Sequence, residues 1–226
     1  MFFPEKIKSI KKNDRVLEIG PGSSPHSRSD VLLERKFDHE TEAAAQRGCT
    51  SLLTTEKKIV YYEGDQFPFG DREFDYIICS HVLEHIDDVD AFASELTRVG
   101  RMGYVEFPTV YYEYLYNFSV HKTLLIERNR VIYWMTKDES GLNKFKDINC
   151  FFLETLVKGY NELVNEFKVY LFQGFEWESI IRTERTSDLR LLAYNASEID
   201  ISVNTNFRQK YLHMLSKLKK RFAVTK

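Results

Sequence analysis

The chain of 226 residues has little cysteine and no long apolar run. Its three cysteines, Cys49, Cys79 and Cys150, are odd in number and far apart, which argues against a disulfide framework and against a cysteine-based zinc site. No apolar stretch approaches the roughly 20 residues that a membrane span needs, and the N-terminal residues lack the apolar region of a signal peptide. We therefore expect a cytoplasmic protein.

An excess of charge of either sign is also missing. The chain has 32 Lys and Arg against 34 Asp and Glu, a formal net charge of -2, so its overall charge gives no special affinity for nucleic acid. We see no basic, aromatic-interleaved groove and expect no nucleic-acid partner. Internal repeats, low-complexity tracts and Gly/Ser linkers are absent as well. We therefore expect a single domain over residues 1–226.

The stretch that organises the chain is Asp14–Ser24. A short apolar strand, 16–19, runs directly into a turn that contains Gly20 and Gly22, and Glu18 lies inside the strand. Glycine has no Cβ, so the backbone of such a turn can approach a ligand closely. Open α/β sheets bind nucleotides at the carboxyl ends of their strands, at turns of this kind. The pattern therefore predicts a nucleotide-type ligand at this turn.

Strands and helices alternate through roughly the first half of the chain, which indicates a mostly parallel sheet with helices on both faces. Residues 74–80 are nearly continuously apolar, as in a strand covered on both sides. Gly100 is expected to cap the C-terminus of the helix predicted at 88–99. The strands are predicted at 16–19, 31–34, 58–63, 74–80 and 104–107, and the helices at 4–10, 39–47 and 88–99.

The alternation ends after Pro108. We expect an insertion that contains a hairpin (122–127 and 131–135) and a helix (151–167), then two late strands (175–182 and 189–194) as an antiparallel pair at the sheet edge, and a final helix (207–222). The expected parts are a cofactor-binding core at 10–110, a substrate-side insertion at 109–170 and a basic amphipathic helix at 205–226. A basic helix of this type either packs on its own domain with solvated charges or contacts an anionic membrane surface or a partner.

Four stretches, taken in order, resemble one family. They are Val-Leu-Glu-Ile-Gly-Pro-Gly at 16–22, the acid-ended strand at 31–34, Gly64-Asp65, and Phe-Asp-Tyr-Ile-Ile-Cys-Ser-His-Val-Leu-Glu-His at 74–85. Together they resemble the class I S-adenosylmethionine-dependent methyltransferases, in particular the methyltransferase type 11 group, over about residues 10–110. The resemblance implies a Rossmann-like fold and S-adenosyl-L-methionine as the cofactor.

The resemblance also implies roles for individual residues. Gly20 and Gly22 would pass close to the methionine part of the cofactor, and Glu18 would hold its amino group. Glu34 would accept hydrogen bonds from the two ribose hydroxyls, since a carboxylate is an acceptor with two oxygens. In the loop that begins at Gly64, Asp65 would accept a hydrogen bond from the adenine amine and Gln66 would lie beside the adenine ring. The methyl-donor end of the cofactor would be lined by Ser80, His81 and Val82.

One feature departs from the family pattern. Only about a dozen residues link the first strand to the second, which is near the minimum for a parallel crossover. The helix that usually follows the glycine turn must be very short or absent. The N-terminus of that helix normally faces the cofactor carboxylate, and Arg28 or His26 would then bind the carboxylate instead.

The same residues support other interpretations. Gly20–Pro25 could be a dinucleotide fingerprint, although Pro25 stands where that pattern wants a third glycine, or a tight turn that binds nothing. Residues 81–85, His-Val-Leu-Glu-His, fit the inverted zincin pattern. A strand ends one residue before them, however, so we expect no metal, a packing or capping role for His85, and His81 facing the pocket. Glu34 and Asp65 could also be solvated acids at strand ends.

The aromatic stretch after Pro108 has two interpretations. Tyr111, Tyr112 and His121 either belong to an aromatic core beneath the insertion or form a substrate wall. His81 and His121 are the candidates for a general base, since an unperturbed imidazole has a pKa near 6.5.

The predicted function is in-line methyl transfer to a small-molecule, saccharide or lipid-linked acceptor. In such a reaction the sulfonium cofactor supplies the driving force and the protein mainly positions the nucleophile. The alternative is a non-catalytic binding or scaffold protein that keeps the cofactor fold.

Overall fold

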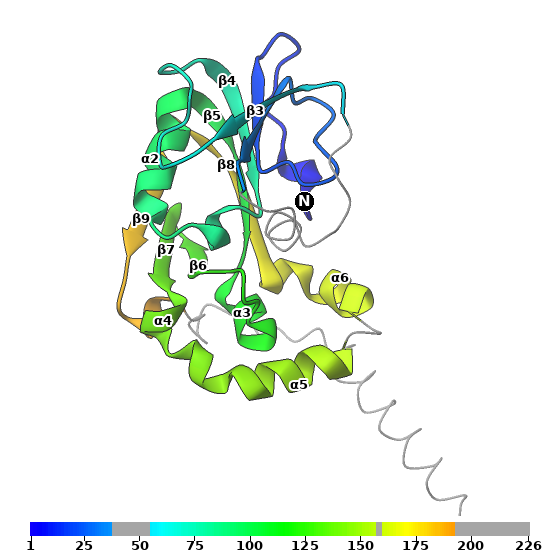
Figure 1. Ribbon diagram of the computed structural model, residues 1–226, viewed down its shortest axis with the longest axis vertical. Coiled ribbons are helices and arrows are strands. Elements are labelled where there is room, and N and C mark those ends of the chain that lie inside the picture. Colours follow the sequence, from blue (N-terminus) through cyan, green and yellow to red (C-terminus); the bar gives the residue numbers. More distant parts are fainter. Residues whose placement is uncertain (38–54, 157–159, 193–226) are drawn as a thin grey trace, which may run out of the picture. The chain divides into compact units, whose positions relative to one another are not determined.

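A computed structural model describes residues 1–37, 55–156 and 160–192. Six strands form the larger sheet, in the order β3-β2-β1-β4-β5-β8, and only β8 is antiparallel to its neighbour β5 (Figure 1). The strands are β1 Val16–Ile19, β2 Val31–Arg35, β3 Lys58–Tyr62, β4 Phe74–Ser80, β5 Gly100–Pro108 and β8 Phe172–Glu178. The predicted Rossmann-like fold class is confirmed, and the strand order reverses between β1 and β4, where such sheets bind ligands.

The two faces of this sheet are covered differently. Alternate residues of a strand point to opposite faces. On one face Leu17 and Ile77 pack with the buried side of α2, Val89–Val99, which lies along the sheet in Figure 1. On the other face Val16 and Tyr76 pack with residues of the N-terminal segment. We expected a helix over 4–10, but the structure has only a single 3-10 turn, η1 Pro4–Lys6.

Helix α2 has the boundaries that its sequence predicts. Asp88 is the N-cap, and its side chain accepts a hydrogen bond from the Ala91 backbone N–H at 3.0 Å. Gly100 follows the last helical residue, but its φ of -116° is extended backbone and not a left-handed cap. A Cβ at this position would lie 2.3 Å from Cγ1 of Ile77. Glycine is therefore required here by the close approach of β4.

The link between β1 and β2 contains no helix in the described residues 20–30, as its length predicted. Its chain is held by polar contacts instead. The Asp30 carboxylate accepts the Val16 backbone N–H at 2.8 Å, and the Asp30 backbone N–H donates to the Val16 carbonyl at 2.9 Å. The helix predicted at 39–47 lies outside the described residues.

A smaller sheet has the order β6-β7-β9, and its strands are β6 Thr123–Arg128, β7 Val131–Thr136 and β9 Arg182–Arg185. β6 and β7 form the predicted hairpin. The prediction for the late strands was wrong in part: β8 pairs with β5 at the sheet edge, whereas Leu189–Leu192 form a helical turn, α7. A short apolar run has the same pattern in a helix and in a strand, and Leu192 is fully buried in this turn.

The remaining helices gather beyond the carboxyl end of β5 (Figure 1). They are α3 Val110–Tyr116, α4 Lys137–Ser140, η3 Leu142–Phe145, α5 Lys146–Leu156 and α6 Tyr160–Leu171. The helix predicted at 151–167 corresponds to parts of α5 and α6, and residues 157–159 between them are not described. The predicted helix at 207–222 also lies outside the described residues. Within the described part of the chain, no helix is long and apolar enough to cross a membrane.

Candidate functional site

The carboxyl ends of the central strands bring together residues that are far apart in the sequence. Ile19 at the end of β1 is in register with Leu33 of β2 on one side and with Cys79 of β4 on the other. The next residues of the three strands, Gly20, Glu34 and Ser80, therefore follow at the same edge of the sheet. Gly20 also donates its backbone N–H to the Leu33 carbonyl at 2.9 Å.

The two glycines of the first turn are needed for different reasons. Gly20 and Gly22 both have φ of +60°, a conformation that residues with a Cβ rarely adopt. A Cβ on Gly20 would also lie 2.7 Å from Cγ2 of Val82, whereas a Cβ on Gly22 would meet nothing within 4 Å. The turn is thus packed against the segment after β4 at Gly20 and is open at Gly22.

Glu18 is buried in β1 and holds the loop that follows its own strand. Its Oε2 accepts the His26 backbone N–H at 2.8 Å and the Ser29 hydroxyl at 2.6 Å. Burial raises the pKa of Glu18, and these hydrogen bonds oppose the rise only in part. Glu18 therefore fixes the loop that carries His26 and Arg28, a contact that the sequence did not predict.

The loop after β3 carries Gly64, Asp65 and Gln66 at the surface. Gly64 has φ of +77°. The loop is tied down immediately afterwards, because the Phe67 backbone N–H donates to Oε2 of Glu95 at 2.8 Å. The position of the predicted adenine contacts therefore depends on helix α2, where Glu95 lies.

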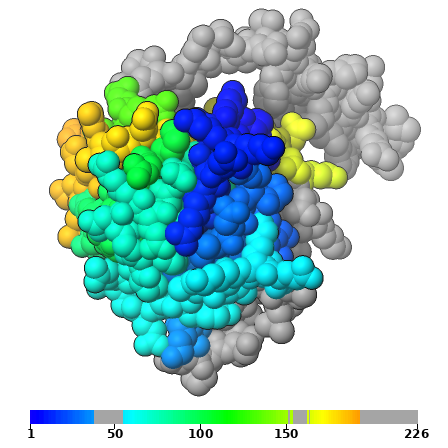
Figure 2. Space-filling view, turned by 90° about the horizontal axis from the view of Figure 1, so that it is seen from above, coloured from blue at the N-terminus to red at the C-terminus, as the bar shows by residue number. Residues whose placement is uncertain are grey.

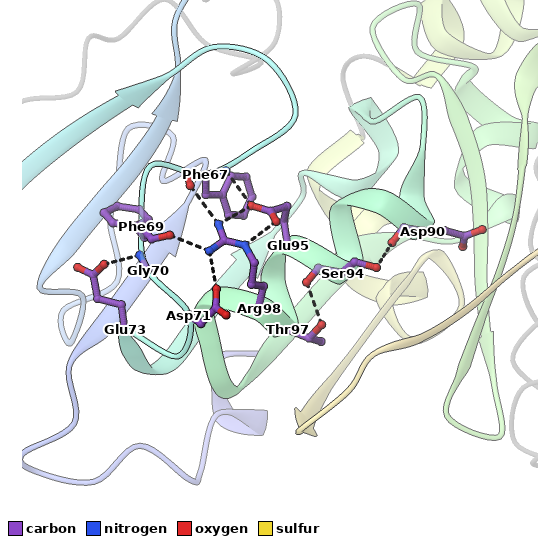
Figure 3. A network of polar contacts seen from close by, with 10 residues as sticks. All are labelled: Phe67, Phe69, Gly70, Asp71, Glu73, Asp90, Ser94, Glu95, Thr97 and Arg98. Atoms are coloured by element: carbon purple, nitrogen blue, oxygen red, sulfur yellow. Dashed lines mark hydrogen bonds and ion pairs between the residues drawn. The ribbon is translucent and has the colours of Figure 1, made fainter.

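Arg98 of α2 completes this anchor, as Figure 3 shows. Its guanidinium donates to both carboxylate oxygens of Glu95 at 2.7 Å, to the carbonyls of Phe67 and Phe69, and to Asp71. One side chain thus fixes two backbone carbonyls of the loop. Such a bidentate, charge-assisted arrangement is stronger than an ordinary surface ion pair.

Glu34 lies at the end of β2 with only 6% of its surface exposed. Its Cα is in register with that of Tyr61 in β3, and the neighbouring Tyr62 is buried. Burial raises the pKa of Tyr62 to about 12, so this phenol stays neutral beside the carboxylate. The structure therefore places a buried acid at the position predicted for the ribose contact.

Glu106 in β5 is a fully buried carboxylate that the sequence analysis did not identify. It accepts hydrogen bonds from both side chains and backbone: Ser80 Oγ at 3.0 Å, His81 Nε2 at 2.9 Å, Tyr104 Oη at 2.6 Å, and the backbone N–H groups of Phe2 and Phe3 at 2.7 and 2.9 Å. Burial alone would raise the pKa of Glu106, but the contacts with His81, Tyr104 and Phe2 lower it to about 2. Glu106 therefore joins the N-terminal segment to the ends of β4 and β5. In Figure 2 that segment, dark blue, runs over the surface of the molecule.

His81 follows β4 and has both ring nitrogens occupied. Nε2 faces Glu106 at 2.9 Å and Nδ1 faces Oε1 of Glu84 at 3.4 Å, while the rings of Phe2 and Phe172 pack edge-on against the imidazole. Burial alone would lower the pKa of His81, but the two carboxylates outweigh this and raise it to about 9. The ring is therefore a cation at neutral pH, and a protonated imidazole cannot accept a further proton. This geometry does not support the predicted role of His81 as a general base.

A second polar cluster lies next to His81. Nδ1 of His121 forms a short hydrogen bond with Oε1 of Glu113, whose other oxygen is 2.6 Å from Nζ of the buried Lys137. Nδ1 of His85 is 3.0 Å from the Val120 carbonyl, and the rings of His85 and His121 are 4.8 Å apart. Burial lowers the pKa of His85. The packing role expected for His85 is thus accompanied by a specific polar contact.

The predicted substrate residues lie on α3 and just before β6. Tyr112 is buried, stacked on Phe118 and in contact with Tyr116, whereas Tyr111 is half-buried. The rings of Tyr112 and His121 are 6.5 Å apart. The structure therefore brings Tyr112 and His121 together, and it places Tyr112 in an aromatic core.

Four charged residues of this region were missed from the sequence: Glu84, Glu106, Glu113 and Lys137. Two of them had a visible signal. Glu106 interrupts an otherwise apolar strand and Glu113 interrupts a run of tyrosines, which is unusual because buried charges need partners. Lys137 gave no such signal, since it follows a strand like many surface lysines.

Residues 17–104 match the profile of a methyltransferase domain family. No curated protein sequence matches the chain. Among solved structures, the chain is similar to the YcgJ protein of Bacillus subtilis (17% identity, 50% of this chain and 57% of that one, TM-score 0.36). It is also similar to a SAM-dependent methyltransferase from Thermotoga maritima (20% identity, 47% and 49%, TM-score 0.32) and to one from Methanosarcina mazei (15% identity, 53% and 69%, TM-score 0.33).

The chain spans about half the length of the Bacillus and Thermotoga structures. The family match covers β1 to β5, the strands whose carboxyl ends form the candidate site. Residues 17–104 therefore match a methyltransferase domain family, and the sheet to which their strands belong is Rossmann-like.

Proposed function

We propose that this chain is an S-adenosylmethionine-dependent methyltransferase that binds its cofactor at the carboxyl ends of β1, β2 and β4. The observation that carries the proposal is the strand register, which sets Gly20, Glu34 and Ser80 side by side where the strand order reverses. Ligands of open α/β sheets bind at this kind of position. The match of residues 17–104 to the methyltransferase domain family supports the same position.

Each part of the cofactor has proposed contacts in this chain. Gly20 and Gly22 lie against the methionine part, and Glu34 accepts the ribose hydroxyls. Glu18 acts through the loop that it holds, because its Oε2 already accepts two hydrogen bonds. The remaining proposed contacts are with adenine, by Gly64, Asp65 and Gln66, and with the methyl-donor end, by Ser80, His81 and Val82.

We assign His81 a positioning role. Its ring is held between Glu106 and Glu84, so it fixes the backbone that follows β4 and gives this edge a half-buried cation. Its φ of +58° agrees with a constrained position. For a hydroxyl substrate, the proposed general base is then His121, oriented by Glu113.

The proposed acceptor is a small molecule, a saccharide or a lipid-linked compound. Tyr111, Tyr112 and His121 form the proposed substrate side, since α3 directly follows the carboxyl end of β5. Aromatic side chains present flat apolar faces with polar tips, which suit sugars and amphiphilic acceptors. The alternative, a protein that binds the cofactor without catalysis, predicts the same binding and no methyl transfer.

Ligand-dependent stability tests the cofactor assignment. S-adenosylhomocysteine at a hundred times its dissociation constant should add about 2.7 kcal/mol to the free energy of unfolding, and NAD should add nothing. Glu34→Gln should weaken the binding of S-adenosylhomocysteine about 10–100-fold, because a charged acceptor for hydroxyls is worth about 1.5–3 kcal/mol.

The matched control is Glu56→Gln, an exposed acid just before the amino end of β3, which should bind like the wild type. The assignment would be overturned if NAD alone raised the free energy of unfolding. It would also be overturned if Glu34→Gln and the wild type bound S-adenosylhomocysteine equally well. Incorporation of a labelled methyl group from the cofactor into a metabolite extract then separates an enzyme from a binding protein.

A further inference from the structure

Three side chains with metal-binding atoms meet beside the proposed donor end. Glu84 and His85 belong to η2, Leu83–His85, and His121 comes from the segment before β6. One ring nitrogen of each histidine and one carboxylate oxygen of Glu84 lie within 4.8 Å of one another. These three residues, which we call the Glu84 cluster, come from two segments that only the fold brings together.

Both histidines are oriented through Nδ1. The Val120 carbonyl can only accept, so Nδ1 of His85 carries the hydrogen of that 3.0 Å contact. Nδ1 of His121 faces the carboxylate of Glu113, which is held in turn by Lys137. An imidazole whose hydrogen is on Nδ1 has its lone pair on Nε2. Metal-binding histidines are held in the same way, by a carbonyl or a carboxylate on the other ring nitrogen.

Glu84 supplies a second, independent observation. Its side chain is 1% exposed, and Oε1 faces His81 at 3.4 Å. Its other oxygen, Oε2, is buried and accepts no hydrogen bond from the residues that the structure describes. Leaving a charged oxygen buried without a partner is costly, and the cost disappears if a cation binds there.

We propose that Glu84, His85 and His121 bind one divalent transition-metal ion of the Zn²⁺ type. Two imidazoles and one carboxylate are the ligand set of zinc sites that keep a fourth position open. The His-Val-Leu-Glu-His segment thus contributes its last two residues, while His81 is already held by Glu106 and Glu84. Bonds of about 2.0–2.2 Å require the ligand atoms to move closer together than they are now.

The role of the ion rests on the proposed function. The site is one contact from His81, at the proposed methyl-donor end. An open fourth position there would hold an acceptor hydroxyl and lower its pKa, as zinc does for bound water. The proton lost by the hydroxyl would go to solvent, and the oxygen would form a bond to the methyl carbon as the bond between sulfur and that carbon breaks, which releases S-adenosylhomocysteine. This would make the enzyme an O-methyltransferase.

Metal uptake by the full chain tests the proposal without any assay of activity. Protein stripped with a chelator should bind one Zn²⁺ per chain in equilibrium dialysis. His85→Gln and His121→Gln should each weaken binding more than 100-fold, and Glu113→Gln should weaken it about 10–100-fold, the usual effect of losing the group that orients a ligand. His26→Gln, the same change at a histidine of the β1–β2 link, should bind like the wild type.

Co²⁺ identifies the ligand atoms. Visible bands of a tetrahedral or five-coordinate ion with nitrogen and oxygen ligands should appear in the wild type and disappear in His121→Gln. Zn²⁺ should also raise the midpoint of thermal unfolding of the wild type and of His26→Gln, but not of the two ligand variants, whose far-ultraviolet circular dichroism shows that they are folded. If either ligand variant does not fold, Glu84→Gln replaces it.

Three results would overturn the proposal: less than one ion per chain, equal uptake by the wild type and His121→Gln, or a thiolate charge-transfer band that assigns the ion to a cysteine. Stoichiometric binding of Mn²⁺ or Fe²⁺ that the same variants abolish would support it. Binding of S-adenosylhomocysteine is measured separately. Metal uptake without binding of S-adenosylhomocysteine would reject the proposed function and keep the metal site.

Discussion

Two buried carboxylates on the same face of the sheet differ in how they are satisfied. Glu18 in β1 accepts hydrogen bonds from His26 and Ser29, a few residues further along the chain. Glu106 in β5 accepts hydrogen bonds from the N-terminal segment and from the end of β4, far away in the sequence. The pKa of Glu18 is raised, and that of Glu106 is lowered to about 2.

The difference comes from the partner of each carboxylate. Glu18 has only neutral donors, so burial dominates and the charged form is penalised. Glu106 has the cation His81 at 2.9 Å as well as neutral donors, and these together outweigh burial. The β1–β2 link is therefore closed by local contacts, whereas the ends of β4 and β5 are joined by an ion pair between distant segments.

Removing the charge of Glu106 should have the largest effect. Glu106→Leu would leave the His81 cation with only Glu84, at 3.4 Å, and would leave the backbone N–H groups of Phe2 and Phe3 without their acceptor. We expect a loss of about 3–5 kcal/mol in the free energy of unfolding. Urea denaturation measures it. Tyr104→Phe, which removes only one neutral donor from the same carboxylate, should lose about 1 kcal/mol. Equal losses in the two variants would contradict the ion-pair account.

The pH dependence of stability should show the same pair. The pKa of His81 is raised to about 9 from an ordinary value near 6.5, so the folded state binds the proton more tightly than the unfolded state. Its contribution is complete below pH 6.5 and is lost as the pH rises through 9, at most about 3 kcal/mol. Urea midpoints from pH 6 to 9.5 should fall in the wild type. They should fall much less in His81→Asn, a residue that tolerates the positive φ.

The glycine turn gives a matched pair of substitutions on the side of Glu18. Gly20→Ala combines a left-handed backbone with a Cβ at 2.7 Å from Val82, so we expect a loss of about 2–4 kcal/mol. Gly22→Ala has the same φ but open space, and we expect about 1 kcal/mol. Thermal unfolding without ligand compares the two. A loss for Gly22→Ala as large as that for Gly20→Ala would show that packing against Val82 contributes nothing.

Neutralising Glu18 should have the smallest effect on stability. Glu18→Gln removes a charge that burial already disfavours, and its amide oxygen can still accept from His26 and Ser29. We expect the free energy of unfolding to change by about 1 kcal/mol or less. Protonation of Glu18 itself favours folding, so its contribution has the opposite sign to that of Glu106 as the pH falls. A loss of 3 kcal/mol or more in urea denaturation would remove the contrast between the two acids.

Much of the cofactor half could be predicted from the sequence. The strands at 16–19 and 74–80 have the predicted bounds, and the strands at 31–34 and 58–63 agree to within one residue. Their apolar runs are continuous, and glycines or acids mark their ends. The late segment 189–194 was misassigned because its run is short and its environment is set by the second sheet.

The candidate site was predictable to the same degree. Gly20, Glu34 and Ser80 lie at the carboxyl ends of strands that meet in any parallel sheet, so their meeting at one edge needed no tertiary detail. The link between His81 and Glu106 joins the carboxyl ends of β4 and β5. Its existence depends on register, which single-sequence patterns do not give.

By itself, the sequence determined the parallel strands, the glycine turn and the acids at the strand ends. The spacing of apolar residues and the residue types of a turn are local properties of the chain. The tertiary structure alone decided which buried charges became partners. His81 is paired with Glu106 and His121 with Glu113 because strand register and the packing of α3 bring them within hydrogen-bond distance. A buried charge is stabilised by whatever lies next to it in space, and neighbours in space are not encoded at any fixed spacing along the chain.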